Sequence, residues 1–194
     1  MTKLFRISSL LMCILFLVSC GAHYTYNNVK YGSKEEALAA QSQNQQEIQK
    51  QIIPTKNKYG GNSLFLIPSL NSIKATGIKK TGKPSEDLID YVAQISMRDY
   101  KNTGECLDKR HIFNKVNIQD VDYPIQYAQE QKSKYDVVIY LKMLDPSQAQ
   151  WMMICKPKYV ERPIYMDMST ALGVPRIISL LDNIEENLKF CSER

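Results

Sequence analysis

The residue types that most often do chemistry are sparse in this chain of 194 residues. The two histidines are His23 and His111, and His111 lies in a basic stretch where a solvated or packing role is expected. No Gly-x-Ser-x-Gly, His-Glu-x-x-His or Cys-x-x-Cys motif occurs. Asp120 and Asp122 form an acidic pair that is too small for a calcium-binding loop. We therefore predict no catalytic residue, no metal site and no cofactor, and a protein that is not an enzyme.

One segment approaches a nucleotide-binding pattern. Residues 77–84 read Gly-Ile-Lys-Lys-Thr-Gly-Lys-Pro, which matches the phosphate-binding loop except at the last position. Pro84 stands where a Ser or Thr hydroxyl would coordinate Mg²⁺, and Gly77 lies well beyond the strand expected to end at Ile67, whereas such a loop follows its strand directly. We interpret residues 69–84 as a basic loop that binds no nucleotide.

The N-terminus is typical of an export signal. Lys3 and Arg6 form a short positive region, and an apolar run follows over Leu10–Val18. This run is far shorter than the roughly 20 residues that cross a bilayer. A positive start, a short apolar run and small residues behind it indicate a signal peptide, which is not part of the fold.

The end of this run, Leu17-Val18-Ser19-Cys20, resembles the lipobox of bacterial lipoproteins. The resemblance implies cleavage between Ser19 and Cys20, a lipid on the Cys20 sulfur, and an acyl chain such as palmitate on the new amino group. Two or more acyl chains hold a protein stably, because each buried methylene contributes about 0.8 kcal/mol. The alternative is an ordinary secretory signal in which Cys20 is incidental.

The residue after the cysteine bears on which membrane is expected. Gly21 stands where an aspartate would suggest retention at the inner membrane. The expected location is therefore the cell outer membrane, with the protein facing the periplasm, and otherwise the outer face of the cytoplasmic membrane. The net charge of +5 includes two signal-peptide residues, and no basic run is interleaved with aromatic residues. We expect no nucleic-acid partner.

The sequence divides into a signal peptide at 1–19, a tether and stalk helix at 20–62, and a periplasmic α/β domain at 63–194. The aromatic-rich stretch 21–33 is either seated at the lipid headgroups or a disordered tether. Ser33 followed by Glu36 forms a capping box and predicts a helix from Lys34 to about Gln51. Because its apolar residues are few, we expect a mostly solvated stalk helix with one weak edge on the domain or on a partner.

Hydrophobic patterns in the remaining chain predict an α/β (α+β) fold: a mixed sheet of about five to six strands with helices packed on it, preceded by the stalk helix. The expected strands are 64–67, 116–118, 136–141, 150–155 and 162–168, and the expected helices are 103–113, 124–133 and 174–190. Residues 87–100 are ambiguous. Their alternation from Ile89 to Met97 favours a strand, whereas Leu88, Val92 and Ile95 would line one face of a helix.

Cys13 is removed with the signal peptide and Cys20 carries the lipid. Three cysteines then remain in an oxidising compartment: Cys106, Cys155 and Cys191. If residues 89–99 form a strand, the alternating directions of the elements place Cys155 and Cys191 at one end of the sheet and Cys106 at the other. Bridging requires Cα atoms within about 7 Å, so we predict a Cys155–Cys191 disulfide and a free Cys106 thiol. Three unpaired cysteines are the alternative.

The order of elements from Leu64 onward resembles the small α/β modules of bacterial envelope lipoproteins. Examples are the curli-secretion lipoprotein, the N-terminal domain of the Tol-system propeller protein, and the auxiliary lipoproteins of envelope ABC transporters. A shared fold says little about activity. We expect a non-enzymatic lipoprotein that docks a protein or envelope component in the periplasm. A structural subunit of an oligomeric envelope or secretion assembly is the alternative, and a third is small-ligand binding between the helices and the sheet.

Replacing Cys20 with Ala is expected to release the protein from membranes into the soluble periplasmic fraction, because the variant has no thiol to carry the lipid. Fractionation of cells followed by a salt wash measures this. A variant that stays in the washed membranes would show that lipid on Cys20 is not the main anchor.

Overall fold

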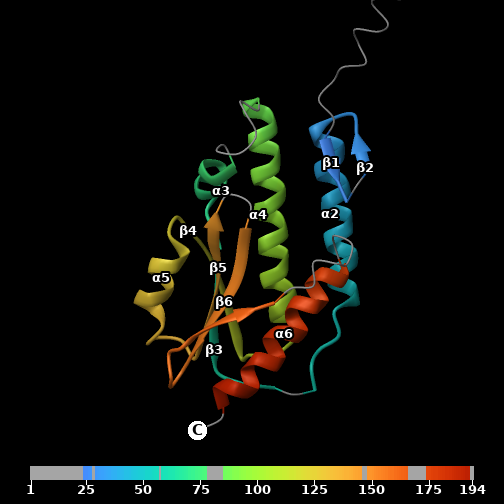
Figure 1. The fold of residues 1–194 in the computed structure, drawn as a ribbon. Helices are drawn as coiled ribbons and strands as arrows, with labels where there is room; N and C mark the ends of the chain where they lie inside the picture. Colours follow the sequence, from blue (N-terminus) through green and yellow to red (C-terminus); the bar gives the residue numbers. More distant parts are fainter. Residues whose placement is uncertain are drawn as a thin grey trace, which may run out of the picture.

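The computed structural model describes residues 24–27, 29–56, 58–77, 85–145, 148–165 and 174–192. A five-stranded mixed sheet has α4 and α6 on one face and α5 on the other, and α2 lies outside α4 (Figure 1). The strands are β1 (Tyr24–Tyr26), β2 (Val29–Tyr31), β3 (Asn62–Pro68), β4 (Lys115–Val121), β5 (Val137–Asp145), β6 (Gln148–Cys155) and β7 (Glu161–Ile164). The helices are α2 (Lys34–Gln51), α3 (Leu70–Gly77), α4 (Glu86–Lys109), α5 (Pro124–Gln131) and α6 (Val174–Ser192). The predicted α/β fold class with a mixed sheet is confirmed.

The sheet has the order β4-β3-β5-β6-β7. Strand β3 pairs in parallel with both β4 and β5, and the β5-β6-β7 set is antiparallel. Strands β3 and β5 carry buried apolar side chains on both faces, because helices cover both faces of the sheet there. The short β7 lies at an edge, where Pro163 costs no ladder hydrogen bond. These strands and the edge position of β7 agree with the sequence patterns.

The prediction of a strand at residues 87–100 is wrong, as is that of a separate helix beginning at 103. A single helix, α4, covers the whole of Glu86–Lys109. The Ser85 hydroxyl caps it by accepting from the Leu88 amide at 3.3 Å. The helical alternative is therefore the right one, but the face that packs is not the predicted stripe of Leu88, Val92 and Ile95. Leu88 and Val92 are exposed, whereas Ala93, Thr103 and Leu107 are buried.

A glycine inside α4 explains how the helix comes so close to the sheet. A Cβ atom on Gly104 would lie 3.0 Å from side-chain atoms of both Ile118 and Phe65. That is closer than ordinary van der Waals contact, so a larger residue would push the helix away from β3 and β4. Gly104 therefore marks a packing contact in the middle of the helix, although glycine usually weakens a helix interior.

The prediction of a loop over residues 69–84 is wrong in its first half, because helix α3 begins there directly after β3. The Ser69 hydroxyl accepts from the Ser72 amide at 3.2 Å and caps this short helix. Residues 78–84, which carry most of the near-match to the phosphate-binding loop, lie outside the described residues.

The N-terminal tyrosines belong to a small hairpin and fit neither interpretation given to residues 21–33. Strands β1 and β2 pair antiparallel around Asn27, whose φ is 50°. The Tyr24 ring contacts Tyr91 of α4 edge-on at a centroid distance of 4.8 Å, and the buried Tyr26 hydroxyl accepts from Asn44 of α2 at 2.9 Å. The hairpin therefore packs on α2 and α4.

The predicted bounds of α2 are confirmed, but the helix does not extend from the domain as a stalk. It runs parallel to α4, because Lys34 contacts Asp90 near the start of both helices and Gln49 contacts Glu105 near their ends. Ile48 is 2% exposed and belongs, with Ile52, to the main hydrophobic core. The end of α2 is therefore part of the folded domain.

Glutamines of α2 make most of the hydrogen bonds between α2 and α4. Gln41 is fully buried and donates to the Ile95 carbonyl oxygen at 2.8 Å and to Asp99 at 3.0 Å, and Gln45 also donates to Asp99. Burial raises the pKa of the Asp99 carboxyl, and these two donors act in the opposite direction. The glutamines that make this helix a poor coiled-coil seam thus serve as hydrogen-bonding partners for α4.

An ion-pair cluster joins three helices at the start of α4. The Asp90 carboxylate lies 2.5 Å from the Lys34 ammonium of α2 and 2.6 Å from that of Lys74 of α3. Hydrogen bonds from Lys34 and then Lys74 lower the pKa of Asp90 to about 2. This cluster holds the beginnings of α2 and α4 and the end of α3 together.

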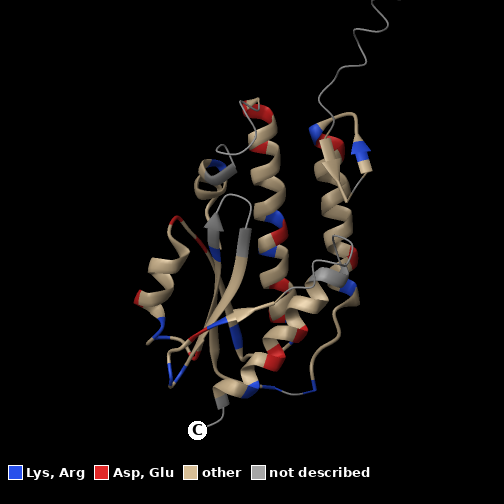
Figure 2. Ribbon diagram, in the orientation of Figure 1, with Lys and Arg blue, Asp and Glu red and all other residues tan. Residues whose placement is uncertain are grey.

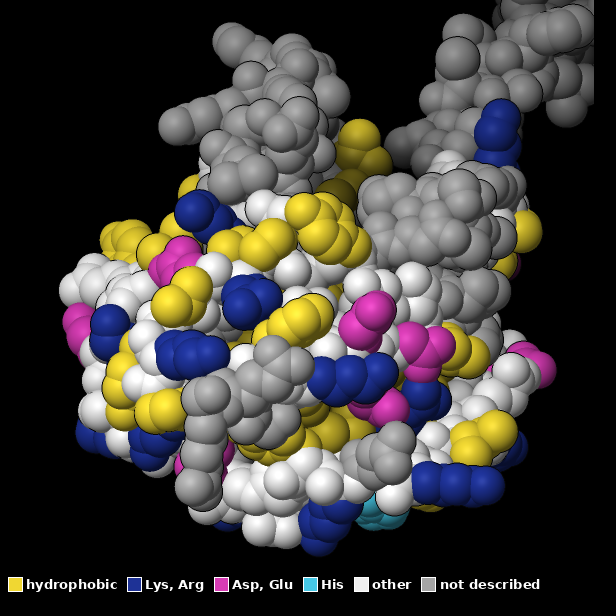
Figure 3. Space-filling view, turned by 60° about the horizontal axis from the view of Figure 1, so that its bottom comes forward, with side chains coloured by type: hydrophobic (Ala, Val, Ile, Leu, Met, Phe, Trp, Pro, Cys, Tyr) yellow, Lys and Arg dark blue, Asp and Glu magenta, His cyan; other side chains and the backbone are white. Residues whose placement is uncertain are grey.

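The domain has two distinct ends. The hairpin and the beginning of α4 lie at one end, and acidic side chains mark the first turn of α4 (Figure 2). Strands β3, β4 and β5 begin at the opposite end, together with the turns that carry many of the basic side chains. At this second end, Lys and Arg side chains are interspersed with apolar ones (Figure 3).

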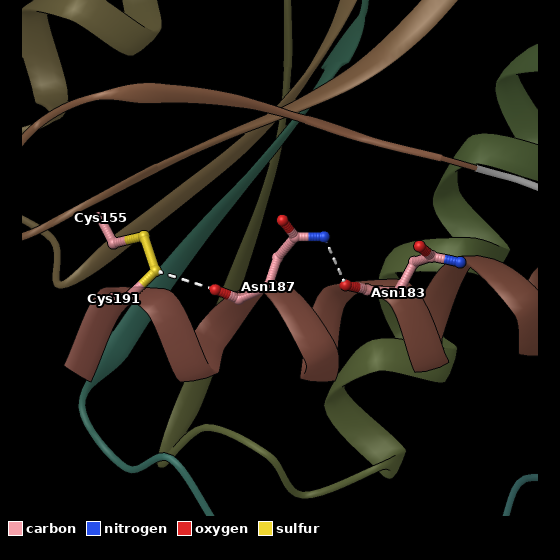
Figure 4. The surroundings of a disulfide bond; sticks show 4 residues. All are labelled: Cys155, Asn183, Asn187 and Cys191. Carbon is pink, nitrogen blue, oxygen red and sulfur yellow. Dashed lines mark hydrogen bonds between the residues drawn. A yellow bond between two sulfur atoms is a disulfide. The ribbon is translucent and has the colours of Figure 1, made fainter. Parts of the chain in front are cut away.

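Cys155 and Cys191 form a disulfide with a Cα–Cα distance of 5.7 Å, and Cys106 is a buried free thiol. The pair is the predicted one, but the reasoning behind it is corrected. Since α4 is one helix, Cys106 lies at the same end of the sheet as the other two. Cys106 is buried in the main core on α4, whereas α6 brings Cys191 to the end of β6, with the Cys191 sulfur 3.6 Å from the Asn187 carbonyl oxygen (Figure 4). Burial raises the pKa of the Cys106 thiol to about 11.

Replacing Ile48 with Ala is expected to lower the free energy of unfolding by about 2–4 kcal/mol, because it empties a position in the main core. Ile53→Ala is the matched control, since Ile53 is 74% exposed and its truncation should change stability by less than about 0.5 kcal/mol. Urea unfolding of both variants measures the difference. Equal, small effects would show that α2 contributes nothing to the core.

Replacing Cys191 with Ser is expected to lower the free energy of unfolding by about 3–4 kcal/mol, because the bridge closes a loop between residues 36 apart. Denaturant unfolding with and without a reductant measures this: the parent should lose stability on reduction and the variant should not. A parent protein indifferent to reductant, or peptide mapping that finds Cys106 in a crosslink, would contradict the pairing.

Candidate functional site

The topology creates a crevice at the carboxyl ends of the parallel strands. From β3 the chain crosses to β4 through α3 and α4 on one face, and from β4 it crosses back past β3 to β5 through α5 on the other face. Connections that leave neighbouring strands toward opposite faces open a gap between them, and open α/β sheets bind ligands at such points. The relevant gap here lies between the ends of β3 and β4.

A groove of about 520 Å³ occupies this position. We call it the switch-point groove, and it lies between the end of β3, helix α3, and the segment that joins β4 to α5. Its lining residues are Pro68, Ser72, Ile73, Ala75, Asp122, Tyr123, Pro124, Ile125, Gln126 and Leu141. The volume is within the usual range for ligand pockets, and most of the lining is apolar.

Hydrogen bonds fix the polar side of the groove. The Ser69 hydroxyl donates to the Asp122 carboxylate, the Ser72 hydroxyl donates to the Asp122 carbonyl oxygen at 2.7 Å, and the Ser69 amide donates to the Val121 carbonyl oxygen at 2.8 Å. These bonds tie the start of α3 to the end of β4. The two sides of the groove are therefore held at a fixed separation.

Two large side chains form an exposed apolar rim. Tyr123 is 74% exposed and Ile125 is 41% exposed, and both stand at the start of α5. Pro124 at the first position of α5 fixes the backbone there, while Tyr123 makes no capping hydrogen bond. Exposed aromatic and aliphatic side chains beside an apolar groove are a common sign of an interaction site.

The groove continues into a shallower depression with an acidic edge. This depression has a volume of about 170 Å³ and shares Asp122, Tyr123 and Gln126 with the groove. Its far edge carries Glu130, which accepts from Gln126 at 3.0 Å. An apolar groove bordered by two carboxylates can bind an apolar group that has a cation next to it. Among the described lining residues of the groove, Asp122 carries the one charged side chain.

The residues predicted from sequence lie away from this groove. Cys20 lies outside the described residues, and the Cys155–Cys191 disulfide is at the opposite end of the sheet. Within the part of the chain that the structure describes, no three His, Cys, Asp or Glu side chains are grouped as metal ligands. No helix in that part has the length and hydropathy of a membrane span.

The sequence analysis missed the groove, although part of its signal is in the sequence. The pattern Asp122-Tyr123-Pro124-Ile125 places two large apolar residues around a helix-starting proline, where polar residues are usual. What the sequence could not supply is α3, which forms the other wall and lies in the stretch expected to be a loop. Without that wall, the apolar start of α5 does not predict a groove.

Comparison with known proteins finds no match: no protein-family model, no curated protein and no solved structure is significantly similar to this chain.

Proposed function

We propose that this protein is a bacterial lipoprotein, anchored through Cys20 in the outer membrane, whose α/β domain docks an envelope protein in the periplasm without catalysing a reaction. The switch-point groove is the docking site, and an apolar segment of the partner occupies it. One observation carries this proposal: an open, mostly apolar groove at the carboxyl ends of the parallel strands, with Tyr123 and Ile125 exposed on its rim.

The chemistry of the rim narrows the kind of partner. Asp122 and Glu130 border the groove and its shallow extension, so a partner with Lys or Arg beside its apolar segment gains two attractive contacts. An apolar side chain placed in the groove gains roughly 25 cal/mol for each Å² removed from water. We therefore expect an aliphatic or aromatic anchor followed closely by a basic residue.

The position of the tether supports the anchored arrangement. Cys20 and Tyr24 are four positions apart in the sequence, a stretch that spans about 14 Å at most. Tyr24 packs on Tyr91 at the end of the domain where α4 begins, and β3 and β4 also end there. A lipid on Cys20 would therefore hold the groove close to the membrane, within reach of partners that lie at its surface.

The alternative partner is a second copy of the chain, as in an oligomeric envelope assembly. Both edge strands of the sheet, β4 and β7, have one unpaired side among the described residues, and β4 is seven residues long. An exposed edge of this length can pair with another chain, although the Asp108 carboxylate already accepts from the Val116 amide. The experiment below distinguishes the two partners.

A photo-crosslinking side chain placed at Tyr123 in intact cells is expected to give one discrete adduct. The matched control places the same group at Ile53, which is also 74% exposed but lies far from the groove. Adding Ile125→Asp to the Tyr123 probe should lower the adduct yield about tenfold, because a buried unpaired charge costs more than 1.4 kcal/mol. Mass spectrometry of the adduct identifies its components.

The composition of the adduct distinguishes an envelope protein from a second copy of the chain. An adduct with an envelope protein whose crosslinked segment is apolar and flanked by Lys or Arg supports the proposal. An adduct of two copies of this chain supports the oligomeric assembly instead. Equal adducts from Tyr123 and Ile53, or a yield unaffected by Ile125→Asp, would show that the groove is not the docking site.

A further inference from the structure

The geometry points to a second interaction surface, at the end of the domain opposite the tether, that docks on an anionic lipid bilayer. We call it the lysine turns: the connection from α5 to β5 with Lys132 and Lys134, and the connection from β6 to β7 with Lys156 and Lys158. This surface lies outside the switch-point groove. Binding to a bilayer depends on these residues alone, whereas the identification of that bilayer as a second, opposing one rests on the proposed lipid anchor at Cys20.

The two turns lie side by side. Val137 pairs with Cys155 across the β5–β6 ladder, and the Lys156 amide donates to the Asp136 carbonyl oxygen at 3.0 Å. The Gln129 amide group donates to Glu161 at 2.6 Å and joins α5 to the start of β7. The four lysines therefore belong to one patch of the surface, which faces the viewer in Figure 3.

Within the described part of the chain, no ion pair neutralises the lysines of this patch. None of the four makes a salt bridge with another described residue. Three carboxylates lie nearby, and each is hydrogen-bonded to a neutral donor: Asp136 to the Asn62 amide at 2.8 Å, Glu130 to Gln126 and Glu161 to Gln129. With Arg162 added to the lysines, basic groups outnumber acidic ones, so the patch attracts anions.

The tip of the second turn is apolar. Between Lys158 and the start of β7, Tyr159 is 38% exposed and Val160 is 57% exposed. Lysines around exposed apolar side chains suit a bilayer surface, where lysines reach the headgroup phosphates, tyrosine favours the interface and valine enters the acyl region. A polyanion in solution would use the lysines alone and leave the apolar tip in water. The tip therefore favours a bilayer.

The fold holds this tip in place on both sides. Cys155, immediately before the turn, is bonded to Cys191 of α6, and Arg162, just after it, lies over the Phe190 ring at 4.9 Å from its centroid. The Tyr159 amide also donates to the Cys155 carbonyl oxygen at 2.9 Å, which closes the turn. A tip fixed in advance loses less conformational entropy on binding.

The position of the lysine turns determines which bilayer they can meet. They lie where α4 ends, and the tether leaves where α4 begins, with the helix between them about 36 Å long. With the tether in one membrane, the lysine turns face away from it. The anionic bilayer they dock on is therefore a second, opposing one.

The test uses the full processed chain reconstituted in neutral phosphatidylcholine vesicles. Acceptor vesicles contain about 30% phosphatidylglycerol, and light scattering measures their clustering with the donors. We expect clustering that disappears in about 0.5 M salt, because screening shortens the range of the attraction. Flotation of the donor vesicles alone reports the anchor separately. If the chain stays in solution instead, its co-sedimentation with the same acceptors measures the same binding.

Two variants of equal charge change identify the site. Lys134, Lys156 and Lys158 replaced together by Gln should weaken acceptor binding about 100-fold, at roughly a tenfold factor or less for each lysine. Lys30, Lys50 and Lys101 replaced by Gln remove the same charge from exposed positions on other elements and should leave binding unchanged. Equal losses in both triple variants would overturn the site, as would equal clustering with neutral acceptors.

A third variant tests the apolar tip. Val160→Ser should weaken binding about fivefold, because it removes apolar surface that would enter the acyl region. Circular dichroism and denaturant unfolding of all variants check that the fold is unchanged. Binding that depends on the three lysines but not on Val160 would show that the patch recognises a polyanion, and the bilayer proposal would be wrong.

Discussion

The structure depends on one strand, β3, which pairs in parallel with a neighbour on each side. Parallel neighbours must be joined by crossovers, and right-handed crossovers in opposite directions place their helices on opposite faces of the sheet. Helix α4 therefore covers one face and α5 the other, and the switch-point groove opens between α3, at the end of β3, and the start of α5. Docking through this groove is our proposal; the groove itself follows directly from the strand order.

Helix α4 connects the sheet to the other helices of the domain. Gly104 lets it approach the sheet, Asp90 joins it to α2 and α3 by ion pairs, and Arg110, just past its end, pairs with Asp182 and Glu185 of α6. Most of the hydrogen bonds between α4 and α2 involve glutamines of α2, and two buried atoms there, Gln41 Oε1 and Asn102 Nδ2, have no partner among the described residues. A polar contact of this kind specifies one register, since any slip leaves more groups unpaired.

The two ends of the domain have different chemistry, which suits a molecule held between two environments. The end near the β1–β2 hairpin carries an apolar groove with a weakly acidic rim. The other end carries basic turns around an apolar tip, braced by the Cys155–Cys191 disulfide. Both proposed interactions act through surfaces that the fold holds rigid, so neither requires a change of conformation. This is consistent with a docking protein and needs no catalytic group.

Short-range patterns in the sequence were enough to predict the capping box that starts α2, the apolar strands β3, β5 and β6, the edge strand with Pro163, and the last helix, because each depends on neighbours a few residues away. The tertiary structure decided what local pattern left undetermined. Residues 87–100 fit both periods, and only packing against the sheet selected the helix. The groove needs α3 and the start of α5, about 50 residues apart, to face each other, which only the crossover topology accomplishes. The pairing of the cysteines likewise depends on where each cysteine lies across the sheet. The residues next to a cysteine do not determine that position, because it depends on the order of the strands.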